Sequence, residues 1–350
     1  MHTIIEHCDQ DQFANGQSGR DLRVCWDATQ LKTQLMEAID SVGDFVDYVE
    51  LSSRPTAINQ RRLLIEMETS IQEHERARID VVSARLNYLA EATPKPVNFA
   101  YDPPPGVPRR SGKYVERSVA IHNGREMLSR FSLDTNGFVL TEHDTAVRDF
   151  YDSDEVRSVY YPEVERLIKR VTGAERVVVF DHIVRNPVLA KRGEKGAREP
   201  AKIVHNDYSL KSAPRRVRDH LPEEAEHLLR NRFAEINVWR AIRGPIESSP
   251  LALCDARSLN VEDSVPTDLV YRDRVGETLS FLYNPRHRWY FFPRMQPKEA
   301  ILLKCYDSED DGRARFTAHT SFEDPSSPPY AAPRESIEVR ALVFWAPETI

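Results

Sequence analysis

A series of short, strand-like apolar runs fills the second half of the chain, and it limits the possible folds more than any other feature. The runs follow one another at fairly regular spacing, with proline-rich turns between them. Such a series, preceded by helical segments, is typical of two antiparallel sheets packed as a jelly roll. We therefore predict an α+β chain with a double-stranded β-helix (jelly-roll) core, an outer helical layer and an N-terminal helical extension. The runs span residues 236–239, 251–254, 279–283, 288–292, 300–306 and 336–345.

The first eighty residues follow a different periodicity. Between residues 27 and 79, apolar side chains recur at helical spacing, as at Leu31, Leu35 and Ile39, which indicates amphipathic helices. We expect residues 1–80 to form a helical extension and residues 81–350 to form the jelly-roll domain. The helices would then cover the core or pair two subunits in a homodimer.

The segments between these parts alternate between predicted strands and helices. Strands are expected at residues 82–88, 117–121 and 137–140, and the proline-rich stretch 94–108 should be an extended surface arm. An apolar stripe over residues 153–171 predicts a helix that ends at Gly173. Residues 176–181 alternate too little for an edge strand, so we predict a strand buried inside its sheet. Pro222 is expected to begin a further helix that continues to about residue 233.

Composition excludes several classes of function. The net charge is -7 and the pI is about 5.9, and the basic clusters are short and lack interleaved aromatic residues, so we predict no nucleic-acid partner. No apolar stretch approaches the roughly 18 residues that a membrane span needs, and the N-terminus lacks the apolar region of a signal peptide. The 4 cysteines are scattered, which fits neither a zinc ribbon nor a disulfide framework. A reduced, cytoplasmic protein without a membrane partner is therefore expected.

A histidine and an aspartate two residues apart, His205 and Asp207, lie in a strand-like run at residues 203–209. Because side chains alternate along a strand, both would point to the same face. An imidazole and a carboxylate so placed are two-thirds of the facial triad that holds non-haem Fe(II) and leaves coordination positions open. Our candidate for the third ligand is His319. A second pair with this spacing, at residues 7 and 9, lies in a polar terminal stretch that we expect to be frayed.

The last predicted strand carries a second set of candidate functional residues. Arg334 and Ser336 are two apart, so they share a face, and Arg340 lies on the same face further along. A guanidinium beside a hydroxyl suits a carboxylate, because the guanidinium makes a bidentate ion pair and the hydroxyl adds a third hydrogen bond. This arrangement could hold the distal carboxylate of a 2-oxoglutarate-type cosubstrate. For Arg340, an ion pair with Glu338 or another acid is the competing interpretation.

Several segments together resemble the fungal and bacterial hydroxylase/desaturase family, which includes AsaB-type enzymes, gibberellin desaturase relatives and CmcJ-like proteins. The resemblance covers about residues 82–345, and the first eighty residues lie outside it. One departure is Ala241, which stands where the family commonly has a proline after its Asn-x-Trp-Arg motif. The segments are Tyr160-Tyr161-Pro162-Glu163, Val179-Phe180-Asp181-His182, His205-Asn206-Asp207, Asn237-Val238-Trp239-Arg240, residues 319–325 and residues 334–340.

The resemblance implies an oxygenase that uses Fe(II) and 2-oxoglutarate on a jelly-roll core, with a small-molecule substrate and O2, in natural-product biosynthesis. Its metal ligands correspond to His205, Asp207 and His319. Its cosubstrate arginine corresponds to Arg334, with Arg340 as the alternative. Residues Asn237 and Trp239 match positions that we interpret as supporting the metal ligands or lining the substrate pocket.

The sequence leaves the reaction outcome and the substrate open. Hydroxylation, desaturation and oxidative cyclisation all fit the predicted chemistry. The competing functions are a non-catalytic jelly-roll binding protein, a metal-dependent hydrolase or isomerase, and an oxidase that does not use 2-oxoglutarate. A basic group near residue 290 could bind an acidic substrate such as an amino acid or its derivative, although a solvated basic loop is the favoured interpretation. The group comprises Arg286, His287, Arg288 and Arg294.

Overall fold

The computed structural model describes residues 80–346. The predicted helices of residues 27–79, the pair at residues 7 and 9, and the homodimer through the N-terminal helices lie outside the described residues. The domain boundary at residue 80 likewise stays a prediction. Of the four cysteines, Cys254 and Cys305 lie in the described part, where both are buried and neither forms a disulfide.

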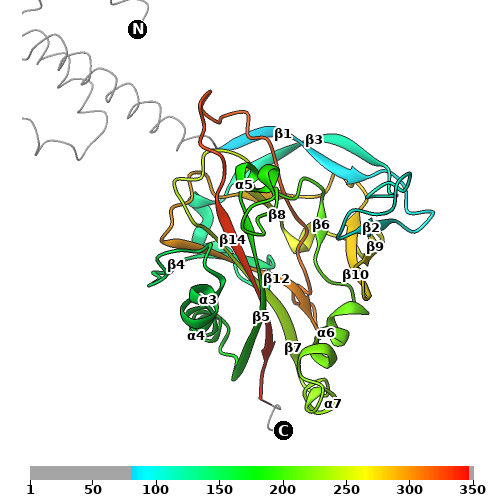
Figure 1. Cartoon of the computed structure of the whole chain (residues 1–350), viewed down its shortest axis with the longest axis vertical. Coiled ribbons are helices and arrows are strands. Elements are labelled where there is room, and N and C mark those ends of the chain that lie inside the picture. The colour runs from blue at the N-terminus through cyan, green and yellow to red at the C-terminus, as the bar shows by residue number, and fades with distance from the viewer. Residues whose placement is uncertain (1–79, 347–350) are drawn as a thin grey trace, which may run out of the picture. The chain divides into compact units, whose positions relative to one another are not determined.

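The described chain forms two sheets (Figure 1). The nine-stranded sheet has the order β1-β3-β11-β8-β13-β6-β10-β9-β2, and the five-stranded sheet has the order β4-β12-β7-β14-β5. The strands of the first sheet are β1 (Val81–Leu89), β2 (Val97–Phe99), β3 (Tyr114–Asn123), β6 (His205–Asn206), β8 (Leu251–Cys254), β9 (Ser264–Val270), β10 (Val275–Phe281), β11 (Trp289–Phe291) and β13 (His319–Ser321). Those of the second are β4 (Phe138–Glu142), β5 (Arg176–Arg185), β7 (Phe233–Ala241), β12 (Glu299–Asp307) and β14 (Ser336–Phe344).

The largest apolar core lies between the two sheets. It joins Leu251 and Leu253 of β8 to Trp239 of β7 and Leu303 of β12. Because strand side chains alternate, the inner face of β14 carries Leu342, while the odd-numbered residues of that strand pack in a second core on the other face. Two sheets that share one core, together with the outer helices, confirm the predicted jelly roll.

Helices cover the outer face of the five-stranded sheet. The stretch predicted at residues 153–171 is helical throughout: α3 (Ser153–Glu155), a π-helical turn (Val156–Tyr160) and α4 (Tyr161–Thr172) follow one another. Gly173 ends this run in the left-handed conformation, with φ of 69°, as predicted. Apolar residues of α4 pack with Val177 of β5 in the second core. The other helices are α5 (Pro187–Arg192), α6 (Ser212–His220), α7 (Ala225–Leu228) and three short 3-10 turns (Arg125–Arg130, Ala256–Ser258, Val261–Asp263).

Two local predictions were wrong. The strand at residues 176–181 is not inside the sheet, because β5 is an edge strand of the five-stranded sheet. Its apolar residues are needed on both faces, since Val177 packs under α4 while Phe180 packs toward the inner core and stacks on His220 of α6. The helix expected over residues 222–233 is also shorter than predicted. Only the four residues of α7 are helical, and the longer helix α6 precedes Pro222.

An irregularity in β5 changes which of its residues face the interior. Arg340 of β14 pairs with Asp181, and the next residue, Ala341, pairs with Val179, so Phe180 has no partner in β14. An extra residue of this kind is a β-bulge. It brings Asp181 onto the same face as Arg340, and their side chains form an ion pair of 3.2 Å.

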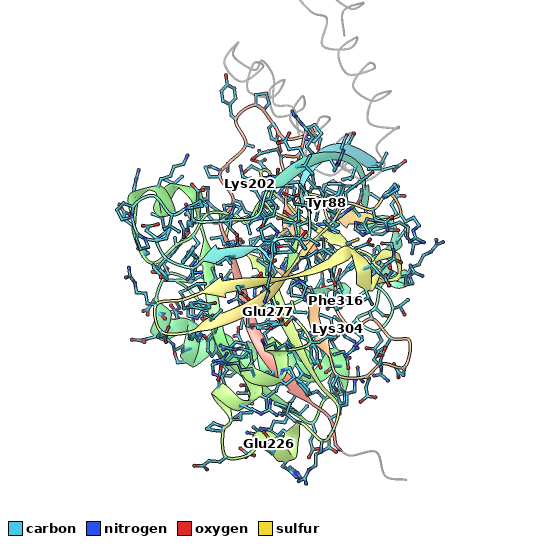
Figure 2. The ribbon with its side chains drawn as sticks, turned by 90° about the vertical axis from the view of Figure 1, so that its right-hand side faces the viewer. Tyr88, Lys202, Glu226, Glu277, Lys304 and Phe316 are labelled. Carbon is cyan, nitrogen blue, oxygen red and sulfur yellow. The ribbon has the colours of Figure 1, made fainter. Side chains whose placement is uncertain are left out.

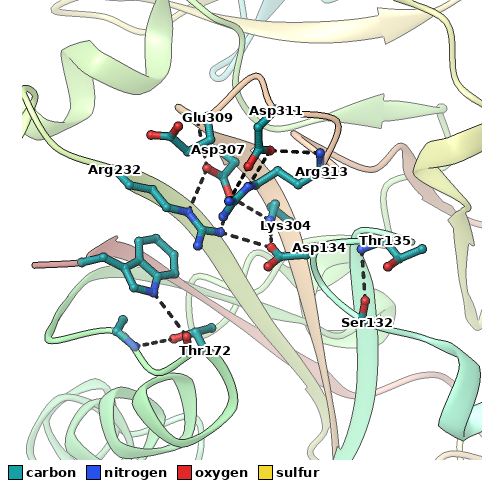
Figure 3. Close-up of polar contacts among 12 residues, drawn as sticks. Ser132, Asp134, Thr135, Thr172, Arg232, Lys304, Asp307, Glu309, Asp311 and Arg313 are labelled. Atoms are coloured by element: carbon teal, nitrogen blue, oxygen red, sulfur yellow. Dashed lines mark hydrogen bonds and ion pairs between the residues drawn. The ribbon is translucent and has the colours of Figure 1, made fainter. Parts of the chain in front are cut away.

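A buried charged cluster lies where β12 ends (Figure 3). The ammonium of Lys304, which is 1% exposed, lies 2.6 Å from Asp134 and 2.7 Å from Asp307, and Arg232 reaches the same two carboxylates. The backbone carbonyl of Lys304 accepts a hydrogen bond from the amide of Thr317, two residues before β13. The cluster therefore fixes the segment that leads to His319.

The described residues contain no helix that combines the length and apolarity required to cross a membrane.

Candidate active site

The two predicted histidine ligands lie on neighbouring strands at the centre of the nine-stranded sheet. His205 of β6 pairs directly with His319 of β13, and the centroids of their imidazole rings are 4.4 Å apart. β6 is only two residues long and is held between β13 and β10, where Ser280 pairs with His205. One cross-strand pair thus brings together two histidines that are more than a hundred residues apart in the sequence.

Asp207 follows β6 and completes a group of three possible metal ligands. One ligand atom from each of His205, Asp207 and His319 lies within 4.8 Å of the others. Asp207 Oδ1 is 3.7 Å from His205 Nε2, while Asp207 Oδ2 accepts a hydrogen bond of 2.8 Å from Asn237 and lies 3.3 Å from Arg340 Nε. One carboxylate oxygen is therefore held by the protein, and the other faces the histidines.

Backbone carbonyls orient both imidazoles. His205 Nδ1 lies 2.8 Å from the carbonyl oxygen of Ile203, and His319 Nδ1 lies 3.5 Å from that of Thr317. Because a carbonyl oxygen only accepts hydrogen bonds, Nδ1 carries the proton and Nε2 keeps a free lone pair. Burial, reinforced by His319, lowers the pKa of His205 to about 4, so the ring is neutral near pH 7.

Asp207 remains ionised in the same surroundings. Burial acts to raise its pKa, but Arg340 and the two histidines outweigh this effect and hold the pKa of Asp207 well below its usual range. The loop after Asp207 is fixed by Glu277 of β10 (centre of Figure 2), which accepts a 2.6 Å hydrogen bond from Ser209 Oγ. Two neutral imidazoles and one carboxylate thus converge on one point from rigid positions.

A cavity joins this point to Arg334. It reaches both histidines, and Trp239 forms part of its wall. Its lining consists of Arg185, Ala201, His205, Trp239, Leu251, His319, Thr320, Ser321, Arg334 and Glu338.

Arg334 is a buried cation without a direct ion pair, since Glu338, the carboxylate that acts on it, is paired with Arg340. The side chain of Arg334 is 3% exposed, and it forms no ion pair within residues 80–346. One nitrogen donates a 2.6 Å hydrogen bond to the carbonyl oxygen of Ser249, its guanidinium lies 5.5 Å from the ring centroid of Trp239, and Nε has no partner. Burial lowers the pKa of Arg334 to about 9. Ser336 Oγ, on the same face, is also buried and unpaired, so both residues have unused capacity for an acceptor ligand.

Arg340 has the opposite character. It lies on the same face as Ser336, as predicted, but its guanidinium is surrounded by three carboxylates. These belong to Asp207 at 3.3 Å, Asp181 at 3.2 Å and Glu338 at 3.2 Å. The ion pair with Glu338 considered from the sequence is therefore present.

The two residues predicted to line the pocket have different roles, and the predicted basic group lies outside the site. Trp239 lines the cavity, whereas Asn237 contacts Asp207. The basic group near residue 290 does not line the cavity. His287 is buried between Tyr88 and Asp263, and Arg288 pairs with Asp255.

Sequence reasoning missed Arg185 and Glu235, and it gave Glu338 only as a possible partner of Arg340. Arg185 and Glu338 line the cavity, and Glu235 lies on the inner face of β7 two residues before Asn237. The position of Glu338 at the cavity could have been predicted, because it falls between Ser336 and Arg340 in the same alternation. Arg185 comes from the end of an edge strand, and no local pattern marks it.

The residues present fit Fe(II) and 2-oxoglutarate. Two imidazoles and one carboxylate are the ligand set of non-haem Fe(II) oxygenases, and they leave positions open for further ligands. Arg334, which lines the same cavity as the two histidines, offers a cation to a carboxylate, and the buried, unpaired hydroxyl of Ser336 follows two residues later. The carboxylate of Glu338, which also lines the cavity, is paired with Arg340.

Comparison with known proteins gives a consistent result. Residues 86–344 match a family model described as an oxidoreductase/YMDC permease-like domain. The hydroxylase/desaturase CTB9 of Cercospora beticola is 37% identical over 69% of this chain and 79% of its own, and efuI of Hormonema carpetanum, with the same description, is 34% identical over 75% and 95%. The Fe(II)/2-oxoglutarate-dependent dioxygenase nvfI of Aspergillus novofumigatus is 32% identical over 72% and 92%.

A solved structure extends the likeness to the fold. The iron and alpha-ketoglutarate-dependent endoperoxidase NvfI superposes with a TM-score of 0.69 at 29% identity, covering 76% of this chain and 99% of that one. The chain belongs to the hydroxylase/desaturase family of non-haem Fe(II)/2-oxoglutarate-dependent oxygenases.

Proposed function

We propose that this oxygenase binds Fe(II) through His205, Asp207 and His319 and binds 2-oxoglutarate through Arg334 and Ser336, in order to oxidise an unactivated C–H bond of a small molecule. The observation that carries the assignment is the buried guanidinium of Arg334, which forms no ion pair among the described residues and lines the cavity that reaches both histidines. A cation buried without a counter-charge is costly, and a dicarboxylate supplies the missing charge. Arg340 would serve instead to hold Asp207.

Each residue then has a separate task. The two histidines present Nε2 to the metal because their Nδ1 atoms face carbonyl oxygens. Asn237 and Arg340 hold one oxygen of Asp207, so the other oxygen would be the one available to the metal. Trp239 forms the wall of the cavity along which the cosubstrate would lie, and it excludes water there.

When bound, Fe(II) with 2-oxoglutarate supplies the oxygen activation and C–H oxidation that no side chain can perform. The protein contributes orientation. Rigid strands carry His205 and His319, and the buried charged cluster around Lys304 fixes the approach to β13. A reaction outcome that depends on the position of one carbon needs such rigidity.

We infer that the pathway is one of natural-product biosynthesis, because the relatives include hydroxylase/desaturases and an endoperoxidase of fungi. Hydroxylation, desaturation and cyclisation remain the candidate outcomes. The homodimer and the cytoplasmic location also remain proposals. Sedimentation of the full chain against a chain that begins at residue 80 would test the dimer, since a dimer through the extension should be lost on truncation.

The experiment that tests the proposal is an anaerobic titration of the full-length apoprotein with Fe(II) and then 2-oxoglutarate. We expect a weak visible charge-transfer band from the chelated keto acid, absent in His205→Ala and weakened in Arg334→Gln. If iron binds without forming the band, the 2-oxoglutarate assignment is wrong, and the hypotheses of a hydrolase or an oxidase gain support. If iron does not bind, the ligand assignment is wrong and the binding-protein reading gains support.

A further inference from the structure

The cavity beside the metal-ligand group contains a second arginine, Arg185, which lies at the end of β5. In the pairing of β5 with β14, Arg185 is directly opposite Ser336. Residues that pair directly across two antiparallel strands point to the same face, so Arg185 shares the inner face of the sheet with Ser336. Arg185 and Arg334 both line the cavity. Two guanidinium groups therefore face one cavity that also reaches both histidines.

Arg185 has hydrogen-bond donors that no described residue uses. Its side chain is partly buried and forms no ion pair within residues 80–346. Nη1 donates a 2.7 Å hydrogen bond to the carbonyl oxygen of Glu199. Glu338, the carboxylate in the cavity lining, is paired with Arg340 at 3.2 Å. Because a guanidinium has five N–H donors, Arg185 keeps most of them for a further acceptor.

A hydrogen-bonded segment connects Arg185 to β13, the strand that carries His319. Glu199 supplies the carbonyl that holds Arg185, and two residues later the carbonyl oxygen of Ala201 accepts hydrogen bonds from Ser321. The donors are the backbone amide of Ser321 at 2.8 Å and its Oγ at 2.9 Å. Ser321 belongs to β13, and both Ala201 and Ser321 line the cavity. Arg185 is thus fixed against a wall of the cavity that carries a metal ligand.

Arg334 is held by a different wall, since its guanidinium lies 5.5 Å from the ring centroid of Trp239 in β7. The charges that act on the two arginines differ accordingly. Burial lowers the pKa of Arg185, and the carboxylates of Glu338 and Asp207 oppose this effect. Burial also lowers the pKa of Arg334, but here Glu338 is the carboxylate that opposes it. Of the two arginines, Arg185 is therefore the one close to the metal-ligand group.

Two cations without ion pairs suit a ligand with two carboxylates. 2-Oxoglutarate carries one carboxylate at each end, and the keto-acid end chelates a metal through one oxygen of its carboxylate. The second oxygen of that carboxylate can still accept hydrogen bonds from a guanidinium. A ligand that extends from the histidines to Arg334 within this cavity would also contact Arg185, which lines it.

We propose that Arg185 binds the keto-acid carboxylate of 2-oxoglutarate, the one beside the metal, while Arg334 binds the distal carboxylate. The inference rests on the proposed function, because it requires that this cavity holds 2-oxoglutarate. It assigns a separate arginine to each end of the cosubstrate. Arg185 would thereby limit the ways in which the keto acid can lie at the metal.

The test is an anaerobic titration of the full-length, Fe(II)-loaded protein with two keto acids, followed by the visible charge-transfer band. 2-Oxoglutarate has both carboxylates, whereas 2-oxovalerate has the same chain length and lacks the distal one. Arg185→Gln should raise the Kd of both keto acids by the same factor, about tenfold, which corresponds to ~1.4 kcal/mol. Arg334→Gln should weaken the binding of 2-oxoglutarate and leave that of 2-oxovalerate unchanged.

Two further readouts separate a lost ion pair from damage to the metal site. Fe(II) affinity without a keto acid, measured with a competing chelator, should be unchanged in Arg185→Gln. The charge-transfer band should move to shorter wavelength, because the substitution removes a positive charge that stabilises the electron-accepting keto acid. Arg185→Lys keeps the charge but not the planar fork, so it should leave the band in place and weaken both keto acids less.

Arg198→Gln is the matched control. Arg198 is exposed, its backbone pairs with that of Arg185, and its side chain does not line the cavity. This substitution removes the same charge from the neighbouring position, so it should change neither the affinity for the keto acids nor the band.

Three results would overturn the inference. A loss of affinity confined to 2-oxoglutarate would assign Arg185 to the distal carboxylate, and unchanged affinity for both keto acids would remove it from the cosubstrate. A loss of Fe(II) affinity as large as the loss of keto-acid affinity would make its role structural. Should Arg185→Gln not fold, parent-like affinity of Arg185→Lys for both keto acids would reject the role of Arg185. Absence of the band in the parent would instead reject the 2-oxoglutarate assignment itself.

Discussion

Replacing Arg334 by glutamine should separate the binding of 2-oxoglutarate from the stability of the fold. In the free protein, Arg334 is a buried cation with no carboxylate partner, and burial lowers its pKa to about 9. Because no carboxylate is paired with Arg334, the substitution does not leave a buried carboxylate without its partner. We therefore expect Arg334→Gln to be at least as stable as the parent in the absence of ligand.

The expected loss of affinity follows from the contacts that the side chain can make. A carboxylate held by a guanidinium receives two charge-assisted hydrogen bonds, each worth about 1.5–3 kcal/mol. Glutamine retains one weaker donor, so a net loss of ~3 kcal/mol is expected, which corresponds to a roughly 100-fold increase in the Kd of 2-oxoglutarate. Iron affinity should be unchanged, since Arg334 does not contact a proposed metal ligand.

Arg340→Gln is the matched comparison, because Arg340 lies on the same face but contacts Asp207. Loss of a residue that holds a metal ligand typically costs about 10–100-fold in metal affinity. This variant should therefore bind Fe(II) more weakly and, at saturating iron, bind 2-oxoglutarate with a smaller defect than Arg334→Gln.

The assay is an anaerobic titration that follows the visible charge-transfer band for 2-oxoglutarate, with a competing chelator for Fe(II) and urea unfolding for stability. A 2-oxoglutarate Kd that stays within threefold of the parent in Arg334→Gln, or a larger 2-oxoglutarate defect in Arg340→Gln, would refute the reasoning. Either result would mean that Arg334 is not the residue that binds the carboxylate of 2-oxoglutarate.

Three further outcomes are expected. Lys304→Met should lower the free energy of unfolding by about 2–4 kcal/mol in urea titrations, because it leaves the buried Asp307 with only part of its counter-charge; a loss below 1 kcal/mol would contradict this. Asn237→Ala should weaken Fe(II) binding in chelator competition about tenfold or more without changing the fold, since Asp207 loses its 2.8 Å hydrogen bond; unchanged iron affinity would count against it. Burial lowers the pKa of His143 from 6.5 to about 4, so the unfolded chain takes up a proton first as the pH falls. Stability should decrease from about pH 6.5 to pH 4, less steeply in His143→Gln, and equal slopes would disprove the assignment.

The strands and the ligand group could be predicted because both leave local signals. Alternation within residues 203–209 placed His205 and Asp207 on one side, and the repeated short apolar runs gave the two-sheet architecture. No local sequence signal indicates which strands pair with β6. With only two residues in β6, its place between β13 and β10 depends on long-range pairing, and the contact from Asn237 to Asp207 is equally non-local.

The missed and mistaken elements have their own physical reasons. Helix α6 contains Pro214, and only Ala213 and Val217 mark its apolar side, so its helical signal in the sequence is weak, although both residues are buried in the core. Strand β5 lacks alternation because both of its faces are covered, which looks the same in sequence as a position inside the sheet. Groups without an ion pair, such as Arg185, become recognisable only when the complete set of neighbours is known.

The unpaired residue Phe180 in β5 has a consequence for how the family can vary. Before Phe180, the alternation of side chains along β5 follows the pattern required by the apolar cores. After Phe180, the alternation is the one that directs Asp181 to Arg340. The extra residue shifts the alternation of side chains by one position, so the two halves of β5 follow separate patterns. Each half can therefore change its side chains without disturbing the other. Deletion of Phe180 alone would place Asp181 directly after Val179 and restore a regular ladder with β14, so Asp181 would still face Arg340, and the ring that stacks on His220 would be lost.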